Sequence, residues 1–196
     1  PIMPITNTDI IRPNGEPSVL VGYDPSNATD FATAVSDNNT ATVATQTADA
    51  NKVNELPFED VPSGTSFFPT ADSIDQIDFS VTCRCFRGGM DLGVTLGDNA
   101  GNYGGFTLST ADLAFQTLTK SFTTNSAGDP LSTTSIKFLN VNDLVASGQD
   151  GGEGAAFRLI IAEIFVVVHS SSVIPTQIIR LDSGAITLDS GKITVQ

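Results

Sequence analysis

The feature that most constrains this chain is the run AAFRLIIAEIFVVVH at residues 155–169, which is rich in β-branched and aromatic side chains. Such residues favour a pleated backbone, and the glycines just before the run disfavour a helix. We therefore predict a long central strand. Strict alternation gives it two faces, with Ala162, Ile164, Val166 and Val168 on one and Ile161, Glu163, Phe165 and Val167 on the other. Both faces are too apolar to be left in water. They must be covered either by a second sheet plus a neighbouring subunit or by two layers of this chain.

The rest of the chain consists of short β-like runs between turns, with 17 Gly and 10 Pro in total. The clearest alternation covers residues 77–85, where every second residue is apolar and the residues between are polar. Further strands are expected at residues 18–23, 40–46, 92–96, 106–108, 114–124 and 135–139. About eight strands separated by turns predict an all-β fold, namely an antiparallel, two-sheet, jelly-roll-like sandwich.

Three other segments between the strands have predicted conformations. The sequence DPSN at residues 24–27 is typical of a turn with proline in its second position. Residues 30–35 and 141–147 lack a clean strand alternation, so each is predicted to form a short helical turn.

The two ends of the chain differ from its middle. Residues 1–17 carry three spaced prolines and few apolar residues, which predicts an extended N-terminal arm. Residues 18–170 form the predicted sandwich domain, and residues 171–196 form a short C-terminal tail of β repeats. Within the tail, LDSGAIT at 181–187 is followed directly by LDSGKIT at 188–194. Strand and turn suit this repeat better than a coiled coil, because the glycine recurs and the apolar spacing is irregular.

Composition excludes several partners. With 22 acidic and 9 basic residues the net charge is −13, which argues against nucleic acid because phosphate binding needs clustered Lys and Arg. No run approaches the ~20 apolar residues of a membrane span, and the N-terminus lacks a signal-peptide pattern. We expect a soluble protein that is made in a cytoplasm and does not contact membranes. Cys83 and Cys85 are two apart on one predicted strand, so two buried, reduced thiols are expected.

The sequence offers little catalytic chemistry. His169 is the only histidine and lies where the central strand should emerge into a polar loop, so a surface or interface role is expected. Too few Cys and His residues are present to complete a metal site with Cys83 and Cys85. The acidic loops at 98–102 and 150–153 do not match an EF-hand, so calcium is only a weak alternative. We therefore expect no catalytic residue, no metal and no cofactor.

Taken together, several segments resemble the β-sandwich accessory proteins of tailed-phage virions. They are IIRP (10–13), IDQIDFSVTCRCF (74–86), LGVTLG (92–97), TLTKSFTT (117–124), VNDL (141–144) and FRLIIAEIFVVV (157–168). The resemblance covers about four fifths of the chain and departs from the usual pattern at Ile160 and Ile161, where an aromatic residue is expected. It implies a non-enzymatic virion component on the capsid surface, a homotrimer that decorates or cements the shell by contacting the major capsid protein.

Physical reasoning on the same residues assigns two contact regions. A ring of three copies would cover the outer face of the central strand and let the tails satisfy one another's edges. The predicted trimer interface comprises Ile161, Phe165, Val167, Leu181, Ile186, Leu188, Ile193 and Val195, and the predicted particle-docking residues are Ile10, Ile11 and Pro13. The alternatives are a tail-fibre or receptor-binding module and, third, a carbohydrate-binding or hydrolase domain. The last is disfavoured by the absence of Trp.

Overall fold

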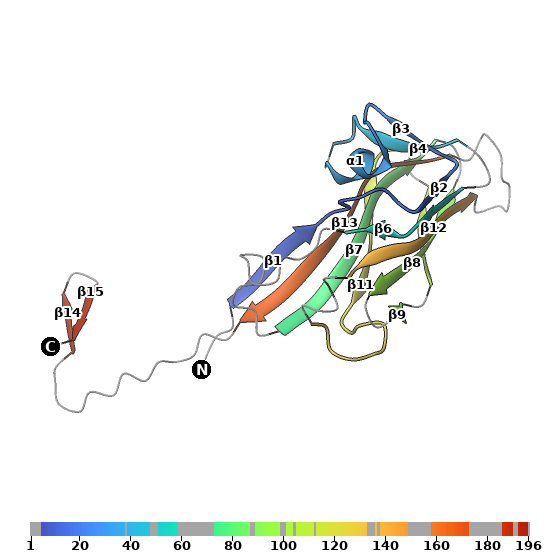
Figure 1. The fold of residues 1–196 in the computed structure, drawn as a ribbon. Helices are drawn as coiled ribbons and strands as arrows, with labels where there is room; N and C mark the ends of the chain where they lie inside the picture. Colours follow the sequence, from blue (N-terminus) through green and yellow to red (C-terminus); the bar gives the residue numbers. More distant parts are fainter. Residues whose placement is uncertain are drawn as a thin grey trace.

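A computed structural model describes residues 5–37, 39–47, 51–58, 73–86, 89–98, 101–103, 105–111, 113–132, 136, 138–148, 158–172, 186–189 and 192–195. Its main body is two antiparallel sheets packed face to face (Figure 1). The predicted all-β sandwich is therefore confirmed.

Each sheet combines strands from distant parts of the sequence. Sheet 1 contains β1 (Ile5–Ile11), β3 (Tyr23–Ser26), β4 (Val43–Gln46), β7 (Ser73–Cys85), β11 (Gln116–Phe122) and β13 (Leu159–Ser172). Its order is β11-β7-β13-β4-β3, with β1 also paired to β13. Sheet 2 contains β2 (Val19–Val21), β5 (Lys52–Asn54), β6 (Leu56–Pro57), β8 (Met90–Asp98), β9 (Gly101–Asn102), β10 (Phe106–Thr110) and β12 (Asn140–Gly148). Its order is β10-β8-β12-β5-β2, with β6 paired to β12 and β9 to β8.

The long apolar run is indeed the central strand of sheet 1. On one side β13 pairs with β7 from Leu159 to Ser171. On the other side it pairs first with β4, at Ile160 and Ile161, and then with β1, up to Ser172. Two strands placed end to end thus share one edge of β13, because β4 is too short to cover it alone.

A β-bulge at Ala162 changes the faces of β13. Ile161 pairs with Cys83 and Glu163 with the adjacent Thr82, so Ala162 is an extra residue on β13. An extra residue resets the alternation of side chains along a strand. The residues of β13 that join the core are Leu159, Ile161, Ile164, Val166 and Val168. The strict alternation predicted from the sequence is therefore wrong for Ile161, which belongs to the core face.

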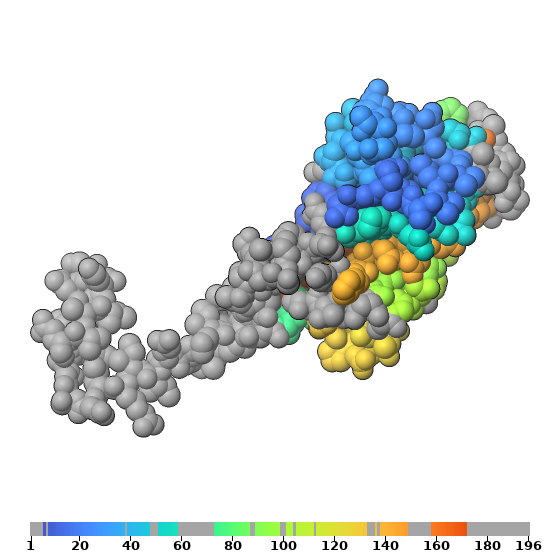
Figure 2. Space-filling model, viewed as in Figure 1, coloured from blue at the N-terminus to red at the C-terminus, as the bar shows by residue number. Residues whose placement is uncertain are grey.

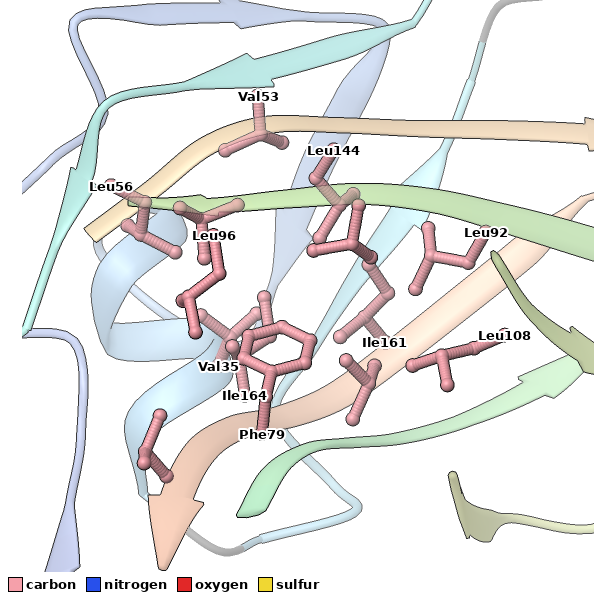
Figure 3. Close-up of a cluster of buried hydrophobic side chains, with 14 of the residues drawn as sticks. Val35, Val53, Leu56, Phe79, Leu92, Leu96, Leu108, Leu144, Ile161 and Ile164 are labelled. Carbon is pink, nitrogen blue, oxygen red and sulfur yellow. The ribbon is translucent and has the colours of Figure 1, made fainter. Parts of the chain in front are cut away.

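Both sheets contribute to one core, shown in part in Figure 3. Phe79, Ile161 and Ile164 from sheet 1 meet Leu96 and Leu144 from sheet 2. The alternation predicted over residues 77–85 is confirmed, because its apolar residues are fully buried and include the two free cysteines.

The helical turn predicted near residue 30 is also confirmed, as α1 (Phe31–Ser36). The Asp30 carboxylate caps its start by accepting a 2.8 Å hydrogen bond from the Thr33 backbone N–H. Phe31 and Val35 join the core, and the Phe31 ring meets Tyr23 edge to face. α1 therefore fills the interior beside β3, β4 and β13.

The extended arm predicted over residues 1–17 is part of the sandwich from residue 5 onward. Residues 5–11 form β1, and the backbone N–H of Asn14 donates to the Pro57 carbonyl at 3.1 Å. Ile11 is completely buried, and Pro13 forms a bridge to Phe58. The physical reason is the open edge of β13 beyond β4, whose backbone groups need a partner strand. Residues 1–4 lie outside the described part of the chain.

Three local predictions were wrong. Residues 24–26 extend a strand, β3, and Pro25 is tolerated there because β3 is the edge of sheet 1. Residues 141–147 belong to β12, where an extra residue, Asn142, interrupts the alternation and imitates a helical spacing. Residues 138–139, which were predicted to end a strand, precede β12 instead.

The C-terminal repeat forms a separate two-stranded hairpin. β14 (Ile186–Asp189) pairs with β15 (Lys192–Val195), which agrees with the predicted strand and turn. In Figure 1 the hairpin stands apart from the sandwich. The register pairs Ile186 with Val195 and Leu188 with Ile193, so alternation assigns these four residues to one face of the hairpin.

The sandwich has two distinct poles. Ile5 pairs with Ser172, so β1 begins where β13 ends, and we call this end the terminal pole. The opposite end, where β13 begins, is the distal pole. There the N-terminal strands β2 to β4 and α1 gather, as the blue region of Figure 2 shows. Both ends of the chain therefore leave the sandwich at one pole.

Truncating the core should be far more damaging than truncating an exposed aromatic residue of the same strand region. Phe79 is fully buried, whereas Phe86 is 64% exposed. Phe79→Ala should lower the free energy of unfolding by ~3–5 kcal/mol through lost burial and a cavity. Phe86→Ala, the matched control, should change it by less than ~1 kcal/mol. Urea unfolding followed by circular dichroism measures both, and equal losses would contradict this placement of the core.

Candidate functional site

One side of sheet 1 faces away from sheet 2. We call it the outer face. Register and alternation place on it a row from each of four neighbouring strands. The rows are Thr117, Thr119 and Ser121 from β11; Gln76, Asp78, Ser80 and Thr82 from β7; Glu163, Phe165, Val167 and His169 from β13; and Thr8 and Ile10 from β1.

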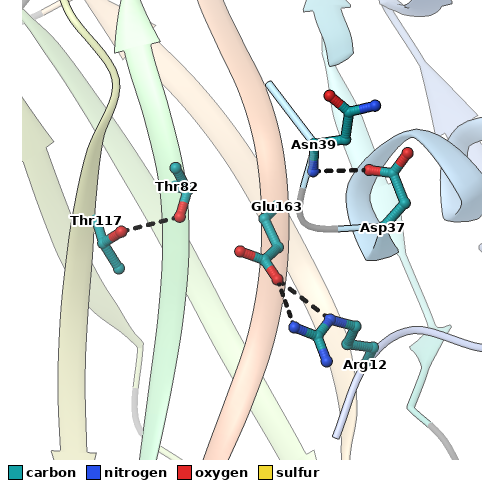
Figure 4. Close-up of polar contacts among 6 residues, drawn as sticks. All are labelled: Arg12, Asp37, Asn39, Thr82, Thr117 and Glu163. Carbon is teal, nitrogen blue, oxygen red and sulfur yellow. Dashed lines mark hydrogen bonds and ion pairs between the residues drawn. The ribbon is translucent and has the colours of Figure 1, made fainter. Parts of the chain in front are cut away.

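One half of the outer face is a ladder of hydroxyl groups. The Thr82 and Thr117 hydroxyls lie 2.9 Å apart across β7 and β11, as Figure 4 shows, and Ser80 and Thr119 repeat the contact at 2.9 Å. Cross-strand hydroxyl pairs of this kind stabilise a sheet. Each contact also occupies one donor and one acceptor site that could otherwise bind a ligand.

The other half carries an apolar strip made of Ile10, Phe165 and Val167. Ile10 pairs directly with Val167 across β1 and β13, and Phe165 is the next residue of β13 on the same face. Ile10 is 41% exposed, and Phe165 and Val167 are half-buried. The strip is therefore a small, flat apolar surface in contact with solvent.

An ion pair lies at one end of the strip. The Glu163 Oε1 atom accepts hydrogen bonds from Arg12 Nε at 3.1 Å and from Arg12 Nη2 at 2.9 Å (Figure 4). The Glu163 side chain is only 7% exposed, so it depends on this partner. Sequence reasoning missed the pair, although a lone acidic residue inside an apolar strand is a signal that a cation must come from elsewhere.

A second polar pair lies at the other end. His169 Nε2 is 2.8 Å from Asp78 Oδ2, across β13 and β7. Partial burial raises the pKa of Asp78, but hydrogen bonds from Ser121, His169 and Gln76 and the charge of His169 outweigh it. The net result is a pKa below its ordinary value of 3.8.

This geometry does not suit a Ser-His-Asp triad. In a triad the carboxylate holds Nδ1 and leaves Nε2 to activate the nucleophile. Here Asp78 occupies Nε2 of the only histidine. His169 is therefore a hydrogen-bond partner of the Asp78 carboxylate, and the surface or interface role predicted for it stays a prediction.

Some residues of the two predicted contact regions lie on the surface, and others are buried. Phe165 and Val167 lie on the outer face, and Ile10, predicted for docking, lies beside them. Ile161 is fully buried in the core, as is Ile11, and Pro13 is also buried, so none of these three offers a surface. Burial follows from the bulge at Ala162 and from the pairing of β1.

The remaining predicted interface residues belong to the tail. Ile186, Leu188, Ile193 and Val195 lie in the hairpin, on the face defined by its register. Leu181 lies outside the described residues.

Other chemistry is sparse in the part of the chain that the structure describes. No group of three or more His, Cys, Asp or Glu residues there could hold a metal ion. Burial raises the pKa of the Cys83 thiol to about 12, and Cys85 adds to the effect, so this thiol is unreactive at neutral pH. A pocket of about 240 Å³ near α1 contains Glu16 and Asp30, whose carboxylates already accept bonds from the helix backbone. Tyr103 is buried, so it cannot stack on a sugar.

Among the described residues, no helix has the length and apolar character needed to cross a membrane. No protein-family model matches this chain, and no curated protein matches it significantly. Functional inference therefore depends on the surfaces described above.

Removing Arg12 should destabilise the protein because it leaves Glu163 buried without a partner. Arg12→Met should lower the free energy of unfolding by ~3–5 kcal/mol, and Arg12→Met combined with Glu163→Met should restore most of it. Lys52→Met is the control, because Lys52 and Asp143 form an exposed pair at 4.0 Å, worth ~0–1 kcal/mol. Urea unfolding of the four proteins provides the measurement. A double variant as unstable as Arg12→Met alone would refute the pairing.

Asp78 should make the free energy of unfolding depend on pH. Because its pKa is lowered in the folded state, its contribution is full above the unfolded value of 3.8 and is lost as the pH falls through the folded value. His169→Gln removes a charge and should raise the pKa of Asp78, which carbon-detected NMR titration of its carboxyl group measures directly. Stability of this variant should also begin to fall at higher pH than in the wild type. An unchanged titration curve would rule out His169 as a cause.

Proposed function

We propose that this chain is a non-enzymatic structural protein of a phage virion that decorates or cements the capsid shell as a homotrimer. The observation that carries the proposal is the outer face, an exposed apolar strip flanked by polar groups that satisfy one another. Such a surface suits contact with another protein better than it suits chemistry. The major capsid protein and further copies of this chain are the proposed partners.

The strand order supports the jelly-roll part of the proposal. Taken in chain order, the eight strands β4, β5, β7, β8, β10, β11, β12 and β13 pair first with last, second with seventh, third with sixth, and fourth with fifth. A long eight-stranded hairpin that rolls up into two sheets has these pairings. Jelly rolls recur in viral capsid proteins and in lectins, so the fold is compatible with a virion role.

The arrangement of the chain at the two poles of the sandwich also supports a role in attachment. Both chain ends leave at the terminal pole, where Ile5 pairs with Ser172. The C-terminal tail therefore starts beside the outer face. A particle or a neighbouring copy contacted at this pole meets the tail and the apolar strip together, so that weak contacts combine.

A receptor-binding or fibre module is the second candidate, and one observation favours it. Phe86 and Leu113, which are 64% and 63% exposed, lie near the distal pole. Arg84 connects them, since it is two residues from Phe86 and its Nη1 atom donates to the Leu113 carbonyl at 3.4 Å. Exposed aromatic and apolar residues at the pole opposite the chain ends would suit recognition of a distant surface.

Copy number in purified particles separates the two candidates. A shell-decorating protein should occur in hundreds of copies per virion, whereas a tail module should occur in a handful, as quantitative mass spectrometry against the major capsid protein would measure. Light scattering on the isolated protein should give three times the chain mass of 20.4 kDa. A handful of copies would favour the tail candidate, and absence from purified virions would overturn both.

A further inference from the structure

Two sets of apolar residues in the described part of the chain could meet in a contact between molecules. The first is the apolar strip of Ile10, Phe165 and Val167 on the outer face. The second is the face of the β14–β15 hairpin that carries Ile186, Leu188, Ile193 and Val195. Each consists of three or four apolar residues on two neighbouring strands.

The hairpin needs something to pack against. Each of its strands has four residues, and an isolated two-stranded hairpin is at best marginally stable in water. Its polar pairs, Thr187 with Thr194 and Asp189 with Lys192, alternate with the apolar pairs. Alternation therefore leaves one face suited to water and one suited to an apolar surface.

The polar groups beside the apolar strip do not prevent its burial in a contact. The carboxylates at its two ends already have partners, Glu163 in an ion pair with Arg12 and Asp78 in a hydrogen bond with His169. A docked hairpin would therefore leave neither carboxylate without a partner in a dry environment, which is the usual obstacle to burying such a surface. The hairpin brings its own opposite charges into register at Asp189 and Lys192.

The tail is long enough to make the contact. Val167 is five residues before Ser172, a distance of roughly 17 Å along a strand. Thirteen residues separate Ser172 from Ile186, and they can span roughly 45 Å when extended. The hairpin can thus reach beyond its own outer face to that of an adjacent molecule.

We infer that the β14–β15 hairpin of one copy docks on the apolar strip of a neighbouring copy. A contact between two different surfaces is heterologous, and when repeated around a closed ring it satisfies every strip and every hairpin. In Figure 1 the hairpin is drawn apart from the sandwich of its own chain. The inference rests on the proposed function only for the number of copies in the ring.

Engineered cysteines test the contact directly. Cys83 and Cys85 are buried, so they should not interfere. Full-length chains carrying Val167→Cys are mixed with chains carrying Ile193→Cys, allowed to exchange subunits, and oxidised with copper phenanthroline. The expected result is a disulfide-linked dimer of the two different chains on a non-reducing gel, with at least ten-fold more product than in the control below.

The control moves the first cysteine to sheet 2. Val19 is 40% exposed on β2, so Val19→Cys mixed with Ile193→Cys should give little product. A single chain carrying both Val167→Cys and Ile193→Cys, oxidised at high dilution, reveals docking onto the chain's own strip. An exclusively intramolecular product, no product, or equal product with Val19→Cys would each overturn the inference.

Failure here can be told apart from failure of the proposed function. A trimer by light scattering that is abundant on virions but forms no mixed disulfide would refute the hairpin contact alone. A mixed disulfide in a protein that is absent from virions would support the hairpin contact and refute the virion role.

Discussion

The structure depends on β13 being paired along both edges. Its inner residues anchor the shared core, and its length exceeds that of β4, so β1 must complete the second edge. This requirement turns the N-terminal segment into part of the sandwich. It also fixes both chain ends at one pole and leaves Ile10 beside Val167 on the outer face. The apolar strip on the outer face is thus a consequence of the pairing of β1 with β13.

Unbroken alternation predicted the strand at residues 77–85, and its lack predicted the helical turn at α1. The repeat predicted strands in the tail, and the spacing of the cysteines predicted two reduced thiols. Prediction from the sequence failed where a bulge added one residue, since Ala162 reversed the expected face of Ile161 and Asn142 disguised β12. It missed the pairs of the candidate site because Arg12 and Glu163 are 151 positions apart, and Asp78 and His169 are 91 apart. Local patterns carry no information on such distant contacts.

The polar groups named on the outer face form hydrogen bonds with one another. The hydroxyls of β7 and β11 form pairs, the Glu163 carboxylate is held by a guanidinium, and the Nε2 atom of His169 faces Asp78. A catalytic site instead needs groups positioned to bond to a substrate. Self-satisfied polar groups around an apolar centre resemble the rim and core of a protein interface.

Net charge explains why contact should occur at this place. Copies that each carry a charge of −13 repel one another, so association needs a region where like charges do not face each other at close range. At the apolar strip the Glu163 carboxylate is paired with the Arg12 guanidinium, and the Asp78 carboxylate is hydrogen-bonded to His169. The strip therefore combines exposed apolar area with carboxylates that already have partners, and higher salt, which screens the remaining repulsion, should favour association there.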